Sequence, residues 1–420
     1  DSCLLGYWSL DEGKGNIAKD SSSYGHDLKI EGAIWVKGKI GYGLEFDGKD
    51  DWCFTEFNLE PGDFTIMFWY LPKEITSWKR VICIGGQYWT GGICVNDNRF
   101  LSPLGNAYFY PELKKWNHIA IVYYKDKGTG KIYRNGLIVG RFSSAKLWDK
   151  EVKGLCLGGM GKYFLSYYPD WFFKGILDEI KIYRSAFSEE KIREEYLKGL
   201  DENERKIKRN IFNKGLLLYY PMREGNGNRC LDRGPYSVDG KICGANWSPG
   251  KSSFLEFDGI DDYVEVPYKE FLLPTDTLTV YAWINPSRLD GSVKRIVSYG
   301  SLYKGQGYHL ICQGNKIGVK LFTEKGAYSV FSEDILKAGI WTNVGFTFSN
   351  SDKLLKLYVN GKMVKQESIE GEIVSLRKPL IIGAGNMEDF NEFEPFAGFI
   401  SEVKLYGKAL NNNQIKGNYR

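Results

Sequence analysis

Paired carboxylates are the side chains of this chain best suited to chemistry. Glycoside hydrolysis, for example, needs two carboxyl groups about 5 to 9.5 Å apart, on either side of the bond that is cleaved. The nearest candidate is the adjacent pair Asp178 and Glu179, in a segment that alternates apolar and polar residues as a strand does. Neighbouring residues of a strand point to opposite faces, so this pair is not expected to share a substrate. The other acidic pairs lie in predicted turns.

Histidines and cysteines give no catalytic pattern either. The three histidines, His26, His118 and His309, are unclustered, and the eight cysteines contain no Cys-x-x-Cys pair. A zinc site of the usual spacing is therefore not expected. Cys230 and Cys243 bracket one loop and could close it as a disulfide, and buried free thiols are the alternative. We predict that the protein is not an enzyme.

Aromatic residues gather in two predicted loops of the first half of the chain, around residue 88 and over residues 163–173. Exposed rings of this kind stack on sugar faces or anchor a protein partner. The residues that we predict to bind a ligand are Tyr88, Trp89, Tyr163, Tyr167, Tyr168 and Trp171. The alternative is that the longer loop buries its own rings against its domain or packs on the other half of the chain.

The chain contains two copies of one pattern. The segment at residues 5–13 returns at 217–225, and the segment at 32–35 returns at 244–247, with the same shift. Further along, LEFDGKDD returns as LEFDGIDD and GILDEIKIY as GFISEVKLY, in the same order. Because a repeat of this length marks a duplicated domain, we predict one domain over residues 1–197, a linker over 198–214 and a second domain over 215–420.

Composition and turn signals predict an all-β fold. The chain has 49 glycines and 28 tyrosines, and short apolar and polar alternations are separated by Gly, Asn and Pro. Asn135-Gly136 and Asn360-Gly361 each stand between two such runs. Asn-Gly favours a type I′ turn, whose two central residues both need positive φ. The sequence therefore predicts a hairpin at the same place in each copy.

Charge separates the two copies and limits the partners. Residues 188–212 are rich in Glu, Lys and Arg, and Ser188 followed by Glu189-Glu190 resembles a helix start. We predict a short helix and a charged linker whose charges face solvent; a partner-binding motif is the alternative. The net charge of +4, from 56 basic and 52 acidic residues, predicts no nucleic-acid partner. No apolar run approaches the roughly 20 residues of a membrane span.

The ordered words YWSLDEGKG, DSSSYGHD, GAIW, LEFDGKDD, FTIMFW, IYRNG and GILDEIKIY, with SEEKI after them, resemble the laminin-G-like family of concanavalin A-like domains. The resemblance covers both copies from end to end. It implies two tandem jelly-roll β-sandwiches, a fold found in lectins, adhesins and modules appended to glycosidases. We therefore expect an extracellular or cell-surface protein.

The resemblance also implies a structural calcium ion at the edge of the sandwich. Calcium binds six to eight oxygen ligands, so carboxylates from distant segments must converge. The acidic residues that we expect to supply them are Glu12, Asp47, Asp178, Glu179, Asp258 and Glu402. The second copy has Ser401 in place of Asp178, which removes one ligand there. The alternative is that Asp47 and Asp258 only form turns with the glycines that follow them.

Two classes of function remain open. The first is a non-catalytic binding or adhesion protein that recognises glycans or a cell-surface protein. The second is a structural subunit of a cell-surface filament or surface layer, in which the same aromatic residues mediate self-assembly. The first copy is expected to carry the binding surface, because the second copy replaces residues 163–173 with an acidic segment, residues 386–394, that is poor in large rings.

Overall fold

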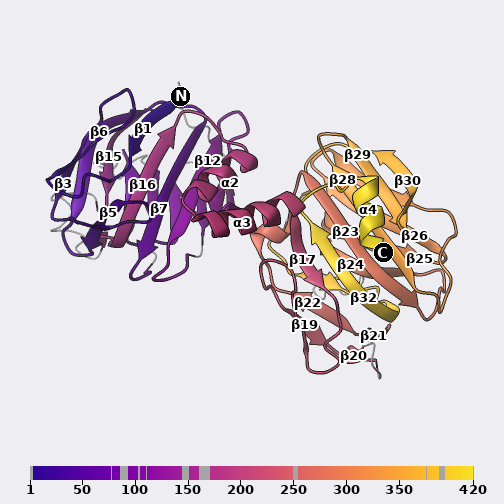
Figure 1. The fold of residues 1–420 in the computed structure, drawn as a ribbon. Helices are drawn as coiled ribbons and strands as arrows, with labels where there is room; N and C mark the ends of the chain where they lie inside the picture. The colour runs from indigo at the N-terminus through magenta and orange to yellow at the C-terminus, as the bar shows by residue number, and fades with distance from the viewer. Residues whose placement is uncertain are drawn as a thin grey trace. The chain divides into compact units, whose positions relative to one another are not determined.

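The structure, a computed structural model, describes residues 3–76, 78–85, 93–102, 105–109, 111–143, 151–159, 171–248, 254–374, 376–386 and 393–419. The chain divides into two compact units, Asp1–Lys208 and Arg209–Arg420. The division falls within helix α3 (Glu202–Lys214), inside the segment that the sequence assigns to the linker. Each unit consists of antiparallel sheets (Figure 1), which confirms the all-β class and the tandem sandwiches joined by a charged helical segment.

Among its described residues, the first unit has two sheets of eight strands. We call one the β16 sheet; its order is β14 (Leu137–Ser143), β13 (Thr129–Arg134), β12 (Asn117–Tyr124), β7 (Phe64–Pro72), β16 (Lys174–Tyr183), β5 (Tyr42–Asp47) and β4 (Ile34–Lys37), with β1 (Leu4–Trp8) also paired to β16. We call the other the β8 sheet; its order is β11 (Gly105–Tyr108), β10 (Arg99–Ser102), β9 (Ile93–Asn96), β8 (Arg80–Ile84), β15 (Val152–Leu157), β6 (Trp52–Leu59), β3 (Leu28–Glu31) and β2 (Ile17–Ala18).

The second unit repeats this arrangement. Its β32 sheet has the order β20 (Asn246–Trp247), β21 (Leu255–Asp258), β32 (Ala397–Tyr406), β23 (Thr277–Pro286), β28 (Thr342–Ser349), β29 (Leu354–Val359) and β30 (Lys362–Ser368), with β17 (Leu216–Tyr220) paired to β32. Its β24 sheet has the order β18 (Arg229–Cys230), β19 (Gly240–Cys243), β22 (Tyr263–Val266), β31 (Leu380–Ile382), β24 (Val293–Ser301), β25 (Gln306–Gln313), β26 (Lys316–Thr323) and β27 (Gly326–Phe331). A short 3-10 helix, η2 (Glu270–Leu272), precedes β23.

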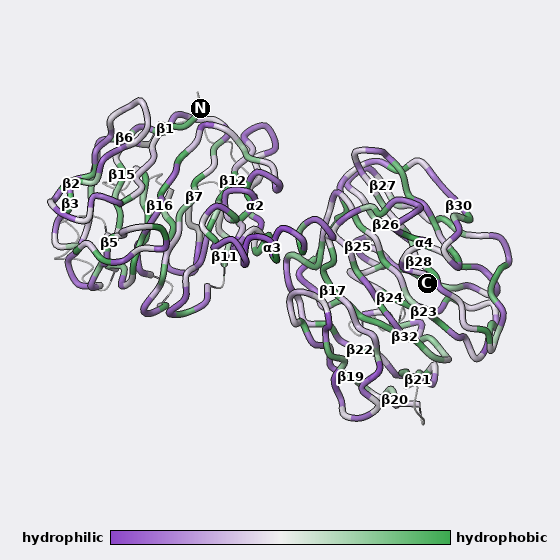
Figure 2. Tube along the Cα trace, viewed as in Figure 1, coloured by the Kyte–Doolittle hydropathy of each residue, from purple (hydrophilic) through white to green (hydrophobic). Residues whose placement is uncertain are grey.

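Alternation along the strands builds a separate core in each unit. In β6, Cys53, Thr55, Phe57 and Leu59 are buried, and the residues between them are more exposed. This period of two turns one face of each sheet toward its partner sheet, and apolar and polar stretches alternate along the strands in Figure 2. The first core includes Trp8, Phe46, Phe68, Ile119, Leu155 and Ile180, all fully or almost fully buried.

The last strand of each unit lies in the interior of its sheet and carries a bulge. β16 pairs with β7, β5 and β1, and its register shifts between Asp178 and Lys181. Within this shift Glu179 has a φ of +54°, and Glu402 in β32 has a φ of +47°. A non-glycine residue rarely adopts a left-handed backbone conformation. The same conformation in both copies therefore indicates that this β-bulge is a regular feature of the domain.

Local signals in the sequence give the hairpins and the first helix. Asn135 and Gly136 have φ values of +52° and +78° between β13 and β14, and Asn360 and Gly361 repeat them between β29 and β30. Both predicted type I′ turns are therefore confirmed. Helix α2 (Glu189–Lys198) begins after Ser188, whose hydroxyl accepts a hydrogen bond from the amide of Lys191.

Helices also cover one tryptophan on each last-strand sheet. Trp69 of β7 stacks on Tyr196 of α2, with ring centroids 5.6 Å apart. In the second unit Trp283 of β23 stacks on Tyr419 of helix α4 (Asn412–Tyr419), also at 5.6 Å. The helix that follows each last strand therefore belongs to its own domain.

All eight cysteines are free thiols. Cys230 lies opposite Gly240 and Cys243 lies opposite Tyr263, so the disulfide considered for this pair does not form. The alternative, free thiols, is what the structure contains. Among the described residues, no helix is both long and apolar enough to cross a membrane.

The exposure of α3 generates a prediction about the domains. Phe212 is its one buried residue, and a helix of this length without packing is marginally stable in water. Brief trypsin digestion should therefore cut at its lysines and arginines and release two fragments that each unfold cooperatively. Mass spectrometry and circular dichroism measure this, and a stable fragment that spans residues 199–214 uncut would count against two independent domains.

Candidate functional site

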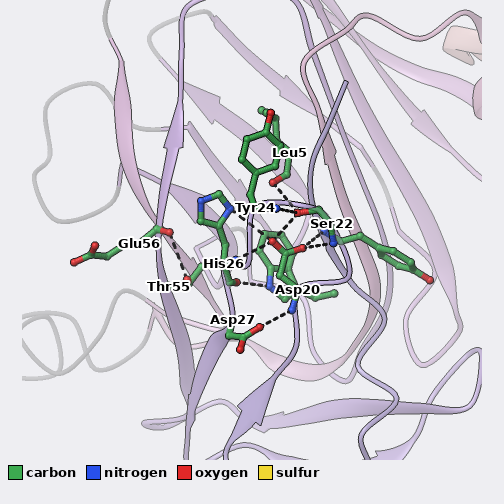
Figure 3. A network of polar contacts seen from close by, with 10 residues as sticks. Leu5, Asp20, Ser22, Tyr24, His26, Asp27, Thr55 and Glu56 are labelled. Carbon is green, nitrogen blue, oxygen red and sulfur yellow. Dashed lines mark hydrogen bonds and ion pairs between the residues drawn. The ribbon is translucent and has the colours of Figure 1, made fainter. Parts of the chain in front are cut away.

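Asp20 is an anchor for the backbone and not a free metal ligand (Figure 3). Its carboxylate accepts hydrogen bonds from the amides of Tyr7, Ser22 and His26, at 2.9, 2.8 and 2.9 Å, and from the Ser22 hydroxyl. Burial favours the neutral form, but these hydrogen bonds outweigh it and hold the pKa of Asp20 below its usual value. In the second domain the carboxylate of Asp232 accepts hydrogen bonds from the amides of Tyr219, Gly234 and Val238.

Asp47 and Asp258 each form a tight turn, as one interpretation of the sequence proposed. Asp47 accepts from the amide of Lys49 at 2.8 Å, and Asp258 accepts from the amide of Ile260 at 2.7 Å. The turns also bring three carboxylates together. Ligand atoms of Asp47, Asp50 and Asp51 lie within 4.8 Å of one another, and so do those of Asp258, Asp261 and Asp262. Such acidic clusters could bind a metal ion.

Asp178 is a buried acid with one unused oxygen. It exposes 0% of its surface, and its Oδ2 atom accepts from the amides of Lys39 and Ile40 at 2.8 and 2.9 Å. Its Oδ1 atom is buried and has no hydrogen-bond partner among the described residues. Burial, together with the charges of Glu179 and Asp11, raises the pKa of Asp178 to about 8.

Glu12 contributes elsewhere. Its Oε1 atom accepts from the amide of Lys19 at 2.9 Å, and its Oε2 atom is buried without a hydrogen-bond partner among the described residues. In the opening segment it is Asp11, not Glu12, whose charge acts on Asp178. The sequence already distinguishes Asp11 from its counterpart, because the repeat aligns this acidic residue with the basic Arg223 in the second copy.

Glu179 lies in the bulge and forms an ion pair with Lys181. Its carboxylate accepts from the hydroxyl of Tyr7 at 2.9 Å, and Lys181 Nζ lies 3.1 Å from its Oε2 atom. The bulge breaks the strict alternation that the sequence predicted, so the charges of Asp178 and Glu179 act on each other. A cavity of about 10 Å³ beside Glu179 has room for about one water molecule and none for a sugar ring.

His118 lines the same cavity and is buried. Burial, helped by the charge of Lys181, lowers the pKa of His118 to about 3. Its ring is therefore neutral at physiological pH and is poorly suited to accept a proton there.

The second domain keeps the glutamate–lysine ion pair but has no acidic residue at the positions of Asp11 and Asp178. Glu402 lies 2.5 Å from Lys404, as Glu179 lies beside Lys181. However, Ser401 replaces Asp178 and donates to the carbonyl oxygen of Pro221, and Arg223 replaces Asp11. The combination of Asp178 with Asp11 and Glu179, whose charges act on it, therefore belongs to the first domain alone, and we call these three residues the acidic centre.

An array of rings and guanidinium groups lies beside the edge of β8. Trp78 is 51% exposed and stacks on Trp171, with centroids 6.4 Å apart and planes 13° from parallel. The Arg80 guanidinium lies 4.7 Å from the Trp171 ring, and the Arg99 guanidinium lies 4.7 Å from the Trp78 ring and 5.6 Å from Tyr108. We call these five residues the tryptophan–arginine stack.

Of the residues predicted to bind a ligand, Trp171 belongs to this stack and is half-buried. The others, Tyr88, Trp89, Tyr163, Tyr167 and Tyr168, lie outside the described residues. Sequence reasoning missed the arginines, because nothing local shows that Arg80 lies next to Trp171.

With this fold and these surfaces, the chain belongs to the concanavalin A-like lectin/glucanases superfamily. The laminin-G-like family model matches residues 46–193 and 258–416, one match in each domain. A comparison with curated protein sequences finds no match.

Solved structures with a similar chain path include the botulinum neurotoxin serotype D binding domain, with 19% identity and a TM-score of 0.40 over 49% of this chain and 52% of that one. Another is domain 4 of an extracellular arabinanase from Geobacillus stearothermophilus in complex with arabinotriose, with 17% identity and a TM-score of 0.36 over 46% of this chain and 97% of that one. The chain thus spans about half the length of the neurotoxin structure. At these identities the likeness concerns the fold alone.

The raised pKa of Asp178 predicts a pH dependence of stability. In the absence of metal, an acid whose pKa rises from 3.8 to about 8 on folding stabilises the fold fully below about pH 4, and this contribution is lost as the pH rises toward 8. Asp178→Asn keeps an acceptor for the amides of Lys39 and Ile40 and has no charge. In EDTA, its first domain should therefore lose less stability between pH 5 and pH 9 than the parent does. Parallel melting curves of parent and variant would contradict the assignment.

Proposed function

We propose that the protein is a non-catalytic, extracellular or cell-surface protein that binds glycans through the tryptophan–arginine stack of its first domain. The observation that supports this most directly is the half-exposed ring of Trp78, which is stacked on Trp171. Adjacent exposed apolar side chains that form one patch can mark a binding surface, whereas single exposed rings are common and need no partner. The planar face of an indole ring can stack on the apolar face of a pyranose. Aromatic residues commonly line ligand sites.

The stack is a preformed surface. Arg80 and Arg99 each lie over a tryptophan ring, so a guanidinium group contacts the face of each ring. Because side chains that are already ordered lose little entropy on binding, such a surface suits a weakly binding partner such as a sugar. The same residues in a subunit contact would make the protein a structural subunit of a filament or surface layer, and the self-association of the purified chain distinguishes the two functions.

We also propose that calcium binds at the acidic centre of the first domain, with Asp11, Asp178 and Glu179 as the acidic residues that hold it. The unused, buried Oδ1 atom of Asp178 supports this, because a buried carboxylate oxygen is costly unless it has a partner. Calcium would supply positive charge that holds Asp178 ionised and links the opening segment to the last strand. The turn clusters around Asp47 and Asp258 are a second place where an ion could bind.

The glycan proposal predicts the effect of removing one ring. Trp78→Ala should weaken binding to any glycan that the parent retains on a glycan array by about 2 kcal/mol or more, roughly thirtyfold, as lost anchor residues do. The domain should stay folded, because half of the ring is already exposed. Isothermal titration calorimetry measures the affinity.

Tyr303→Ala is the matched control, since Tyr303 is 83% exposed in the second domain. This variant should bind like the parent. If no glycan binds the parent and light scattering shows concentration-dependent assembly that Trp78→Ala abolishes, the structural role replaces the binding role.

The calcium proposal predicts a difference between the two domains. Calcium at a hundredfold excess over Kd should raise the free energy of unfolding of the first domain by about 2.7 kcal/mol, and its melting temperature with it. The melting temperature of the second domain should not change. Asp178→Asn should abolish the shift. Differential scanning calorimetry with calcium and with EDTA tests this, and a shift that survives in Asp178→Asn would move the site to the aspartate turns.

A further inference from the structure

We propose that the tryptophan–arginine stack selects acidic saccharides, in which a carboxylate or sulfate group binds the arginines while the sugar ring lies on tryptophan. This inference rests on the proposed function and names its class of ligand. It comes from the charge of the stack, which its aromatic rings alone do not explain.

Arg80 is a buried cation without an acidic partner. Its residue exposes 8% of its surface, and its Nη1 atom donates to the side-chain oxygen of Asn96 at 2.6 Å. Its Nε atom is buried and has no hydrogen-bond partner in the part of the chain that the structure describes. Among the described residues, no carboxylate lies within ion-pair distance of Arg80. Burying a charge without a counter-ion is costly, so this position favours an anion nearby.

The second domain shows which partner this arginine takes when one is available. The amide of Gly158 donates to the carbonyl oxygen of Val81, and the amide of Phe173 donates to the carbonyl oxygen of Gly158. In the second domain the amide of Gly383 donates to the carbonyl oxygen of Ile296, and the amide of Phe396 donates to that of Gly383, at nearly identical lengths. Counting along the chain from these matched residues places Arg295 at the position of Arg80 and Glu394 at the position of Trp171.

Glu394 holds Arg295 in an ion pair. The Nε atom of Arg295 lies 2.7 Å from Glu394 Oε2, and Arg295 is 1% exposed. In the first domain the same position holds the ring of Trp171, on which Arg80 stacks. A ring face neutralises a cation far less than a carboxylate does. The first domain thus has no carboxylate at the position where Glu394 pairs with Arg295 in the second domain.

Arg99 gives an incoming anion a group to bind. It is half-buried, and its one described hydrogen bond, to the hydroxyl of Tyr108, is long at 3.4 Å. Its Nε atom has no hydrogen-bond partner, and no acidic side chain of the described residues forms an ion pair with it. A guanidinium group offers paired donors that match two oxygens of a carboxylate or sulfate. The second ring of the pair, Trp78, lies directly beside it.

The decisive experiment compares saccharides that differ only in charge. The intact chain is titrated with trigalacturonate and with its trimethyl ester, which has the same rings without the carboxylates, and with dextran sulfate and unmodified dextran of equal length. We expect the acidic member of at least one pair to bind about tenfold or more tightly, as hydrogen bonds to charged groups typically contribute. The pair that shows the difference identifies the carboxylate or the sulfate.

Two variants connect this preference to the stack. Arg99→Gln should reduce the preference for the acidic saccharide to less than about threefold. Trp171→Glu places in the first domain the residue that pairs with Arg295 in the second, and should also abolish the preference. Lys206→Gln, an exposed lysine of α3 that lies 2.8 Å from Glu202, removes the same charge elsewhere and should preserve it.

Equal binding of the charged and neutral members, with both lost in Trp78→Ala, would overturn this inference and leave the proposed function intact. A preference that persists in Arg99→Gln and Trp171→Glu, both folded by circular dichroism, would overturn it as well. No binding of any saccharide by the parent would remove the proposed function together with the inference.

Discussion

The bulge in the last strand of each domain is the constraint on which the rest of the first domain's chemistry depends. β16 is hydrogen-bonded to β1, β5 and β7, so the last strand of the domain lies between strands that come from earlier parts of the chain. A regular strand would send Asp178 and Glu179 to opposite faces. The left-handed conformation of Glu179 instead interrupts this alternation, and the Asp178 carboxylate accepts from the amides of residues 39 and 40 while the Glu179 carboxylate accepts from Tyr7. The electrostatics of the acidic centre follow from this backbone geometry.

Features that depend on a few neighbouring residues were predictable from the sequence. The duplicated words gave the two sandwiches, the Asn-Gly pairs gave the hairpins, and Ser188 gave the start of α2. Each of these signals is local, because a turn or a cap is decided by the conformations that its own residues allow. The assignment of the acidic residues to a metal site stays a prediction.

Features that depend on the register of distant strands were not predictable. The sequence analysis treated residues 176–182 as a regular alternation, and the register shift between Asp178 and Lys181 interrupts that alternation. The stack joins Trp78 and Arg80 to Trp171 through a bridge between Arg80 and Phe172, residues that lie far apart in the chain. Only the folded sheet shows that this ring and this cation are neighbours. Comparison of the two domains then shows that equivalent backbone positions carry different partners for the arginine, Trp171 in the first domain and Glu394 in the second.

The helices that cover Trp69 and Trp283 determine how such a chain can be lengthened. Tyr196 and Tyr419 lie after the last strand of their own domain, and each covers a ring of that same domain. A segment that runs from the first strand through this helix therefore covers this tryptophan with its own residues. Units of this kind can be concatenated or deleted in whole numbers without repacking any sheet, whereas a truncation directly after the last strand would uncover a tryptophan. The modular unit of this protein is the sandwich together with its terminal helix.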